Sequence, residues 1–292
     1  MTADAEYDAV RLLDASAEAQ SPPAGHVRRC VDLPVRDDVL HIAADVAVRD
    51  IRLAEIVPFV RRADDRLMEV YLRQLPAQAK EVYCRRGCGV CCQVYLIVLS
   101  PAEMYYQMEM IESLGPDERR RVTEWLAAAG LRARQDGLID RLRSCGPADK
   151  PLDIVDKWWQ TQPPADRTCP FLNVAAGACA YYADRFIACR EHYSHNPPER
   201  CAKLQTDRMA TPLTLINSLW QLEGRLAGEG GGVIELPLMK LWADARRTDA
   251  ARTWPAVEVV DRLFEILVET AVDAQRLRAS AVVERDDGPA GV

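Results

Sequence analysis

Apolar residues recur at helical spacing along most of the chain. Leu67, Val70 and Tyr71 share one face of a segment at 58–75, opposite charged positions, which is the pattern of an amphipathic helix. The same spacing predicts further helices at 101–113, 116–129, 131–143, 213–226 and 254–277. Helices therefore account for most of the regular structure that the pattern predicts.

Strand signals are fewer. Apolar and charged residues alternate between 27 and 48, which predicts one or two short strands. The β-branched run at 94–99 predicts another strand or a buried extended segment. We therefore expect a mainly α-helical fold with a few short strands, in which helices frame an irregular cysteine-rich core.

Ser100-Pro101-Ala102-Glu103 is the clearest local signal in the chain. Ser100 can cap a helix, Pro101 suits its first position, and the Glu103 side chain can bond back to the Ser100 amide. We expect a helix to begin here.

The two ends differ in composition from the middle. Residues 1–25 are acidic and end in a proline-rich stretch, which predicts a mobile tail, and residues 281–292 are charged and glycine-ended, which predicts a disordered tail. Between them we expect a cysteine-cluster metal-binding domain at 26–210. A C-terminal helical region at 211–280 is expected to pack on it.

Overall composition excludes several classes of protein. The net charge is −7, whereas a general nucleic-acid binder needs a basic face. No apolar run approaches the roughly 20 residues that span a bilayer, and the first residues lack the pattern of a secretory signal peptide. We therefore expect a cytoplasmic protein without nucleic-acid or membrane partners. In that reducing compartment, ten cysteines favour metal binding over disulfides.

The first cysteine group lies between residues 84 and 92. It contains Cys84, Cys88, Cys91 and Cys92, with Gly87 and Gly89 between them. The glycines let the backbone curl around a metal, and Arg85 and Arg86 favour thiolate over thiol. Neighbouring side chains diverge, so either a tight turn brings Cys91 and Cys92 inward together, or one of them serves a second metal or the core.

A second cysteine group follows downstream, and its spacing is unlike that of a zinc ribbon. Its members are Cys169, Cys179, Cys189 and Cys201. Eight candidate ligands exceed the roughly four that one zinc ion or one [4Fe–4S] cluster uses. The spacing leaves open two sites, one site with spare thiols, or a larger multinuclear site.

Several other residues near these groups could take part. Arg85, Arg185 and Arg190 could bind an anionic cofactor, and the alternative for the last two is surface salt bridges with Asp184 and Glu191. We expect other side chains of reactive type to act as packing or exposed residues rather than as ligands: His192, His195, Cys30, Cys145, Tyr181 and Tyr182.

Cys84-x3-Cys88-x2-Cys91-Cys92, followed by Cys169-Pro-Phe-Leu, Cys179-x-Tyr-Tyr and Cys189-Arg190, resembles the YkgJ-type cysteine-cluster family. The resemblance covers roughly residues 80 to 195 and includes the Ser100-Pro101-x-Glu103 helix start. One departure is Phe186, which stands where the family usually has proline. The resemblance implies a zinc- or iron-chelating centre, with iron–sulfur favoured because the family includes flagellin lysine N-methylases.

These patterns support three functional hypotheses. The first is an iron–sulfur protein of [4Fe–4S] type that acts in redox chemistry or protein modification such as lysine N-methylation, on an unknown protein or small-molecule substrate. No glycine-rich dinucleotide-type motif supplies a methyl-donor site. The second is a zinc-stabilised interaction protein without catalysis. The third is a radical S-adenosylmethionine enzyme, which the Cys84-x3-Cys88-x2-Cys91 spacing matches but the scarcity of strands disfavours.

Overall fold

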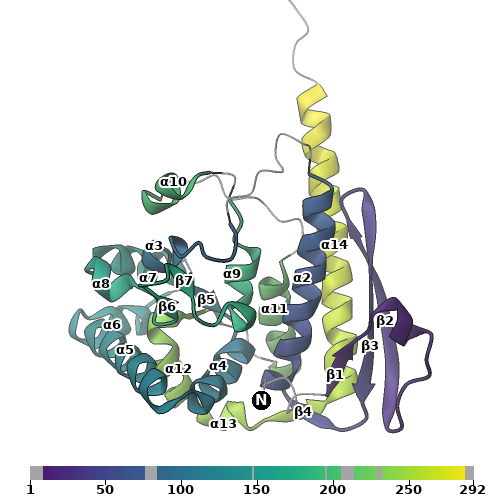
Figure 1. Ribbon diagram of the computed structural model, residues 1–292, viewed down its shortest axis with the longest axis horizontal. Coiled ribbons are helices and arrows are strands. Elements are labelled where there is room, and N and C mark those ends of the chain that lie inside the picture. The colour runs from purple at the N-terminus through teal and green to yellow at the C-terminus, as the bar shows by residue number, and fades with distance from the viewer. Residues whose placement is uncertain are drawn as a thin grey trace, which may run out of the picture.

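A body of helices and a long antiparallel β-ribbon make up the protein (Figure 1). The computed structural model describes residues 9–75, 84–146, 148–194, 196–204, 214–228 and 232–286, with side chains described up to residue 276. Over these residues the fold is mainly α-helical with few strands, which confirms the predicted fold class.

The ribbon forms the N-terminal part of the fold. Strands β1 (Val10–Leu12), β2 (His26–Val35) and β3 (Asp38–Ala47) form an antiparallel sheet in the order β1-β3-β2. The alternation between residues 27 and 48 thus produces two ten-residue strands, longer than the short strands expected. The sheet lies along α14 (Ala256–Asp286), and β2 and β3 both contact that helix (Figure 1).

The predicted mobile tail at 1–25 is wrong for residues 9–25. Val10 pairs with Val46 of β3 and is 1% exposed. Helix α1 (Ala15–Glu18) follows, and the Asp14 side chain caps it by accepting bonds from the amides of Ser16 and Ala17. Asp14, which the sequence pattern places in a mobile acidic tail, therefore serves as a helix cap. The rest of the expected tail, residues 1–8, lies outside the described residues.

The predicted helices are present, with changed ends. Helices α2 (Val57–Arg73), α4 (Pro101–Ser113) and α11 (Leu215–Ala227) lie close to their predicted bounds. Helix α14 continues beyond residue 277 to Asp286, so 281–286 are helical rather than part of a disordered tail. Residues 287–292 lie outside the described part. The smaller elements that complete this body are β4 (Asp50–Arg52), η2 (Leu53–Ile56), α6 (Leu138–Arg143), α7 (Pro151–Thr161), α8 (Pro164–Arg167), β8 (Ile234–Glu235), η5 (Leu236–Leu238), α12 (Met239–Ala245), α13 (Arg247–Ala250) and β9 (Thr253–Pro255).

The break predicted between the helices at 116–129 and 131–143 does not fall at Gly130, which lies between them. Helix α5 (Pro116–Gln135) runs through it, and the side chain of Leu241 on α12 packs so closely that an added Cβ would lie 3.1 Å from it. The break falls instead at Gly137, whose φ of +72° is a conformation that glycine adopts without strain. Gly130 therefore serves helix–helix contact rather than chain reversal.

The segment 94–99 is only partly a strand. Residues Cys91–Val94 form the short helix α3, and β5 is limited to Val98–Leu99, which pairs with β8. Ser100 then caps α4 as predicted, with its Oγ accepting a bond from the Glu103 amide at 3.1 Å. The cap fixes the residue at which α4 begins after the segment that carries the first cysteine group.

The main core lies between α2, α4, α11, α14 and the ribbon. Phe59 of α2 faces Phe264 of α14 with ring centroids 6.2 Å apart. No helix in the described part of the chain has the length and apolar character needed to cross a bilayer.

Candidate metal centre

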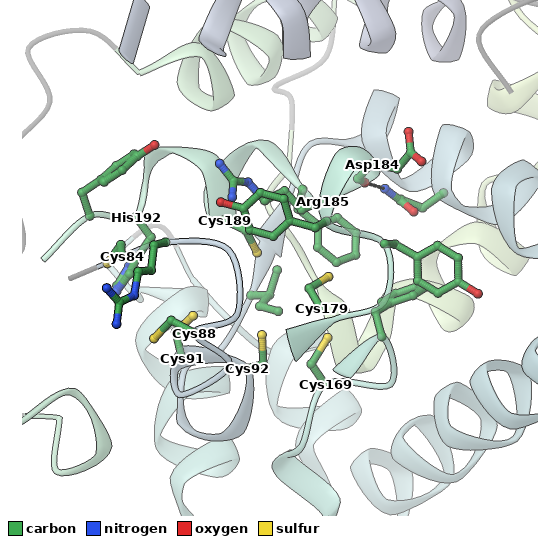
Figure 2. A pocket seen from close by; sticks show the side chains of 18 residues that line it. Cys84, Cys88, Cys91, Cys92, Cys169, Cys179, Asp184, Arg185, Cys189 and His192 are labelled. Atoms are coloured by element: carbon green, nitrogen blue, oxygen red, sulfur yellow. Dashed lines mark hydrogen bonds between the residues drawn. The ribbon is translucent and has the colours of Figure 1, made fainter. Parts of the chain in front are cut away.

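The two cysteine groups meet at one pocket. Figure 2 shows their side chains turned toward a shared space between α3, α9 (Ile187–Glu191) and the hairpin of β6 (Leu172–Asn173) and β7 (Ala178–Cys179). Seven of the eight predicted ligands line this pocket, namely Cys84, Cys88, Cys91, Cys92, Cys169, Cys179 and Cys189. All seven are free thiols. The predicted convergence of the two groups is therefore present in the fold.

Direct contacts hold the two halves together. The amide of Cys169 donates to the carbonyl oxygen of Cys92 at 2.7 Å, which joins the first residue of the second group to the last residue of the first. The amide of Ser194 donates to the Cys84 sulfur at 3.2 Å. Both bonds link segments far apart in the sequence, so the arrangement of the pocket depends on the surrounding fold.

Gly89 permits a close approach between the two halves. A Cβ at this position would lie 2.5 Å from the carbonyl oxygen of Gly177 and 2.6 Å from a methyl carbon of Leu172. The glycine is therefore required by packing against the β6–β7 hairpin. Gly87, with φ at +95°, supplies the turn before it, which a bond from the Cys88 amide to the Arg85 carbonyl closes at 3.0 Å.

The pair Cys91-Cys92 lies on α3. Consecutive residues of an α-helix point about 100° apart, so a helical turn can direct both thiols toward the pocket where an extended strand could not. Both side chains line the pocket. The turn of α3 thus brings both thiols to the pocket wall, and which metal each would bind stays a prediction.

Cys201 stands apart from the other seven. It is 9% exposed, lies on α10 (Pro198–Ala202) and does not line the pocket. Its sulfur lies 3.9 Å from the carbonyl oxygen of Asn196. Helix α10 contacts α3, which carries Cys91 and Cys92, so Cys201 lies on an element next to the first cysteine group.

Burial raises the pKa of five thiols of the pocket and so favours their protonated form. Desolvation raises the pKa of Cys84 to about 11 and also raises the pKa of Cys169, Cys179 and Cys189. The pKa of Cys91 is raised first by a hydrogen bond with the Cys92 side chain and then by burial. Neighbouring thiols add to the effect in each case, because several anions cannot share a low-dielectric site. Thiolates form here only when a cation compensates their charge.

Two of the three predicted arginines lie at the pocket. Arg85 and Arg185 both line it. The Arg185 guanidinium stacks on the Tyr182 ring at 4.1 Å, and its charge lowers the pKa of both Cys179 and Cys189 against the larger effect of burial. Arg185 therefore supplies positive charge to the second cysteine group.

The prediction that Arg190 binds the cofactor is wrong. Arg190 does not line the pocket, and its guanidinium bonds both carboxylate oxygens of Asp65 on α2 at 2.6 Å. It also donates to the carbonyl oxygens of Arg185 and Ala183. The alternative of a surface salt bridge with Glu191 is wrong as well, because Arg190 is 5% exposed and pairs with another helix. Arg190 fixes the 183–190 segment against α2.

Other residues of the pocket wall were not predicted from the sequence. Gln107 of α4 donates to the carbonyl oxygen of Asp184 at 3.3 Å, and both residues line the pocket. Gln107 lies one helical turn after Glu103, so the predicted helix start could have located it. His192 also lines the pocket and packs on Tyr95 with centroids 4.8 Å apart. His195 lies outside the described residues.

The donors that line the pocket are mostly thiols, which suit soft metal ions and iron–sulfur clusters. Within the described residues, no three His, Cys, Asp or Glu side chains are arranged to hold one metal ion. A metal–sulfide cluster holds its cysteine sulfurs farther apart, because its own atoms lie between them. The cavity has a volume of about 80 Å³, whereas one water needs about 10–15 Å³. Seven thiols around this space suit a compact inorganic cluster.

Comparison with protein-family models, with curated proteins and with solved structures finds no match to this chain. The family resemblance drawn from the cysteine motifs thus stays an expectation, and the pocket is the feature of the structure that points to a function.

Proposed function

We propose that the protein binds an iron–sulfur cluster of [4Fe–4S] type through the cysteines of this pocket. The observation that carries the proposal is that seven free thiols from two distant segments line one buried cavity. Structural cysteines are buried singly among apolar residues. Here the thiols face one another, which is favourable when a bound cationic group joins them.

Features around the thiols support an anionic cluster. An all-cysteine cluster carries net negative charge, and Arg185 lies beside Cys179 and Cys189. Backbone amides that donate to cysteine sulfur stabilise the same charge, and Ser194 does so at Cys84. Phe171 and Phe186, whose centroids lie 5.7 Å apart, form an apolar wall that limits water at the site.

A bound cluster would supply one-electron chemistry, and the chain would hold and insulate it. We place the protein in redox chemistry or protein modification, with lysine N-methylation as the reaction that the family resemblance implies. Its substrate is an unknown protein or small molecule. Free thiols throughout the chain agree with a reducing, cytoplasmic compartment.

Anaerobic purification followed by measurement of iron, zinc and acid-labile sulfide per chain tests the proposal. We expect iron and sulfide in equal amounts and a brown absorbance that Cys179→Ala reduces. Cys30→Ala is the matched control, because Cys30 is exposed on β2 and distant from the pocket wall. Stoichiometric zinc without sulfide would contradict the cluster and favour a zinc-stabilised interaction protein.

A further inference from the structure

The cysteines divide into two sets at the junction between Cys91 and Cys92. Figure 2 shows Cys91 next to Cys88 on one side of the pocket and Cys92 next to Cys169 on the other. The two neighbours touch through a hydrogen bond between their side chains. The helical turn of α3 thus presents one thiol to each side, and the boundary between the sets runs through it.

The first set surrounds Cys84 and is called the outer set. It comprises Cys84, Cys88, Cys91 and Cys201. The thiols that act electrostatically on Cys84 are the other three members. Cys201 belongs here because α10, which carries it, packs against α3. The Ser194 amide that donates to the Cys84 sulfur closes this side of the site.

The second set lies at the hairpin and is called the inner set. It comprises Cys92, Cys169, Cys179 and Cys189. Their sulfur atoms face a common space in Figure 2. The bond from the Cys169 amide to the Cys92 carbonyl fixes two members, and β7 and α9 carry the others. Cys91 also acts on Cys169, Cys179 and Cys189, which places it at the wall between the sets.

We infer that the protein holds two [4Fe–4S] clusters side by side, one on the outer set and one on the inner set, with Cys91 and Cys92 as neighbouring ligands to different clusters. This inference rests on the proposed function. Each cluster of this type uses four cysteines, so eight thiols are consumed without remainder. A single cluster would leave four thiols gathered at the site without a role. Adjacent ligands to different clusters also remove the steric difficulty of binding Cys91 and Cys92 to one metal.

The iron content of the anaerobically purified wild-type chain tests this count directly. Two clusters require about eight iron and eight sulfide per chain, and one requires about four. Because the clusters would be neighbours, the electron paramagnetic resonance spectrum of the fully reduced protein is expected to show spin–spin broadening. Neither measurement depends on a variant that might misfold.

Paired substitutions then assign each cluster to its set. Cys88→Ala is expected to lower the iron content by about half, abolish the broadening and leave a simple spectrum from the inner cluster. Cys179→Ala is expected to lower iron equally and leave the outer spectrum. Cys145→Ala, a thiol remote from both sets, is the control and is expected to retain full iron and broadening. Circular dichroism checks that each variant is folded.

The outcomes separate the inference from the proposed function. About eight iron with spin coupling supports two clusters. About four iron without coupling, unchanged in a folded Cys88→Ala variant, overturns the two-cluster inference and leaves the proposed function standing. Absence of iron and sulfide overturns both.

Discussion

The α-carbon of Gly89 faces the carbonyl oxygen of Gly177 so closely that a Cβ would lie 2.5 Å from it. This contact joins the first cysteine loop to the β6–β7 hairpin, and neither partner has a side chain to move aside. Gly89→Ala is therefore expected to destabilise the protein by about 1–3 kcal/mol, the usual cost of overpacking. Thermal unfolding measures it.

Gly115→Ala is the matched control for that substitution. Gly115 has open space around it, and its φ of −55° suits any residue. An equal loss of stability in both variants would show that glycine is not required at position 89 for close packing.

Arg190 is expected to contribute strongly to the stability of the folded state. Arg190→Met removes charge-assisted bonds to Asp65 and leaves the carbonyl oxygens of Ala183 and Arg185 without their donor. Bonds of this kind contribute about 1.5–3 kcal/mol each. We expect a large decrease in the urea midpoint, whereas Arg134→Met, an exposed position on α5, is expected to have little effect. A stable Arg190→Met protein would contradict this role.

Stability is expected to fall as the pH rises toward 8 because of Asp64. Burial raises its pKa to about 8 from 3.8, and neither carboxyl oxygen has a hydrogen-bond partner among the described residues. The folded state therefore keeps a proton that the unfolded chain releases above about pH 4, so the contribution is complete below pH 4 and is lost through pH 8. Between these values one such group gives a slope of about 1.4 kcal/mol per pH unit.

Asp64→Asn is expected to flatten this dependence, because the amide stays neutral at every pH. Denaturant unfolding between pH 5 and 8.5 measures the slope in both proteins. The buried Glu191, whose pKa is also raised by burial, remains in the variant and retains part of it. The control is Asp156→Asn on the exposed side of α7. Parallel slopes for the wild type and Asp64→Asn would show that Asp64 is ionised in the fold.

Arg185→Gln is expected to make Cys179 and Cys189 less reactive in the metal-free protein. The guanidinium lowers the pKa of both thiols, so its loss decreases their thiolate fraction. The alkylation rate falls in proportion to the thiolate fraction, because the thiolate is the nucleophile. Site-resolved mass spectrometry after iodoacetamide treatment follows both thiols. Unchanged alkylation rates at these two positions would show that Arg185 does not lower the pKa of either thiol.

Local signals were the most predictable part of the fold. The Ser100 cap and the amphipathic faces of α2 and α14 depend on residues close in sequence, and the structure has them as predicted. Gly130 was misplaced because its role depends on Leu241, which lies on another helix. The strand β1 was missed for a similar reason. Its three residues lie in an acidic segment and form a strand only because they pair with β3.

The candidate site was predictable in its ligands but not in its surroundings. Cysteines clustered beside glycines can be recognised as candidate ligands from the sequence alone. Seven of the eight line the pocket. Arg190 could not be distinguished from Arg185 by spacing, because only the fold decides which guanidinium reaches Asp65 and which reaches the thiols. Gln107 carries no metal-ligand signal of its own and enters the pocket through the position of α4.

The bond from the Ser194 amide to the Cys84 sulfur spans 110 residues of chain. Protein synthesis proceeds at roughly 5–20 residues per second, so roughly 5–20 s pass between the appearance of Cys84 and that of its partner. During this interval the thiols of the first group are made without the hairpin and α9 that later enclose them. During this period, oxidation of the thiols of the nascent chain or capture of the wrong metal competes with correct formation of the pocket. If the proposed cluster is bound, its insertion would follow that period, as a step of maturation on the folded chain.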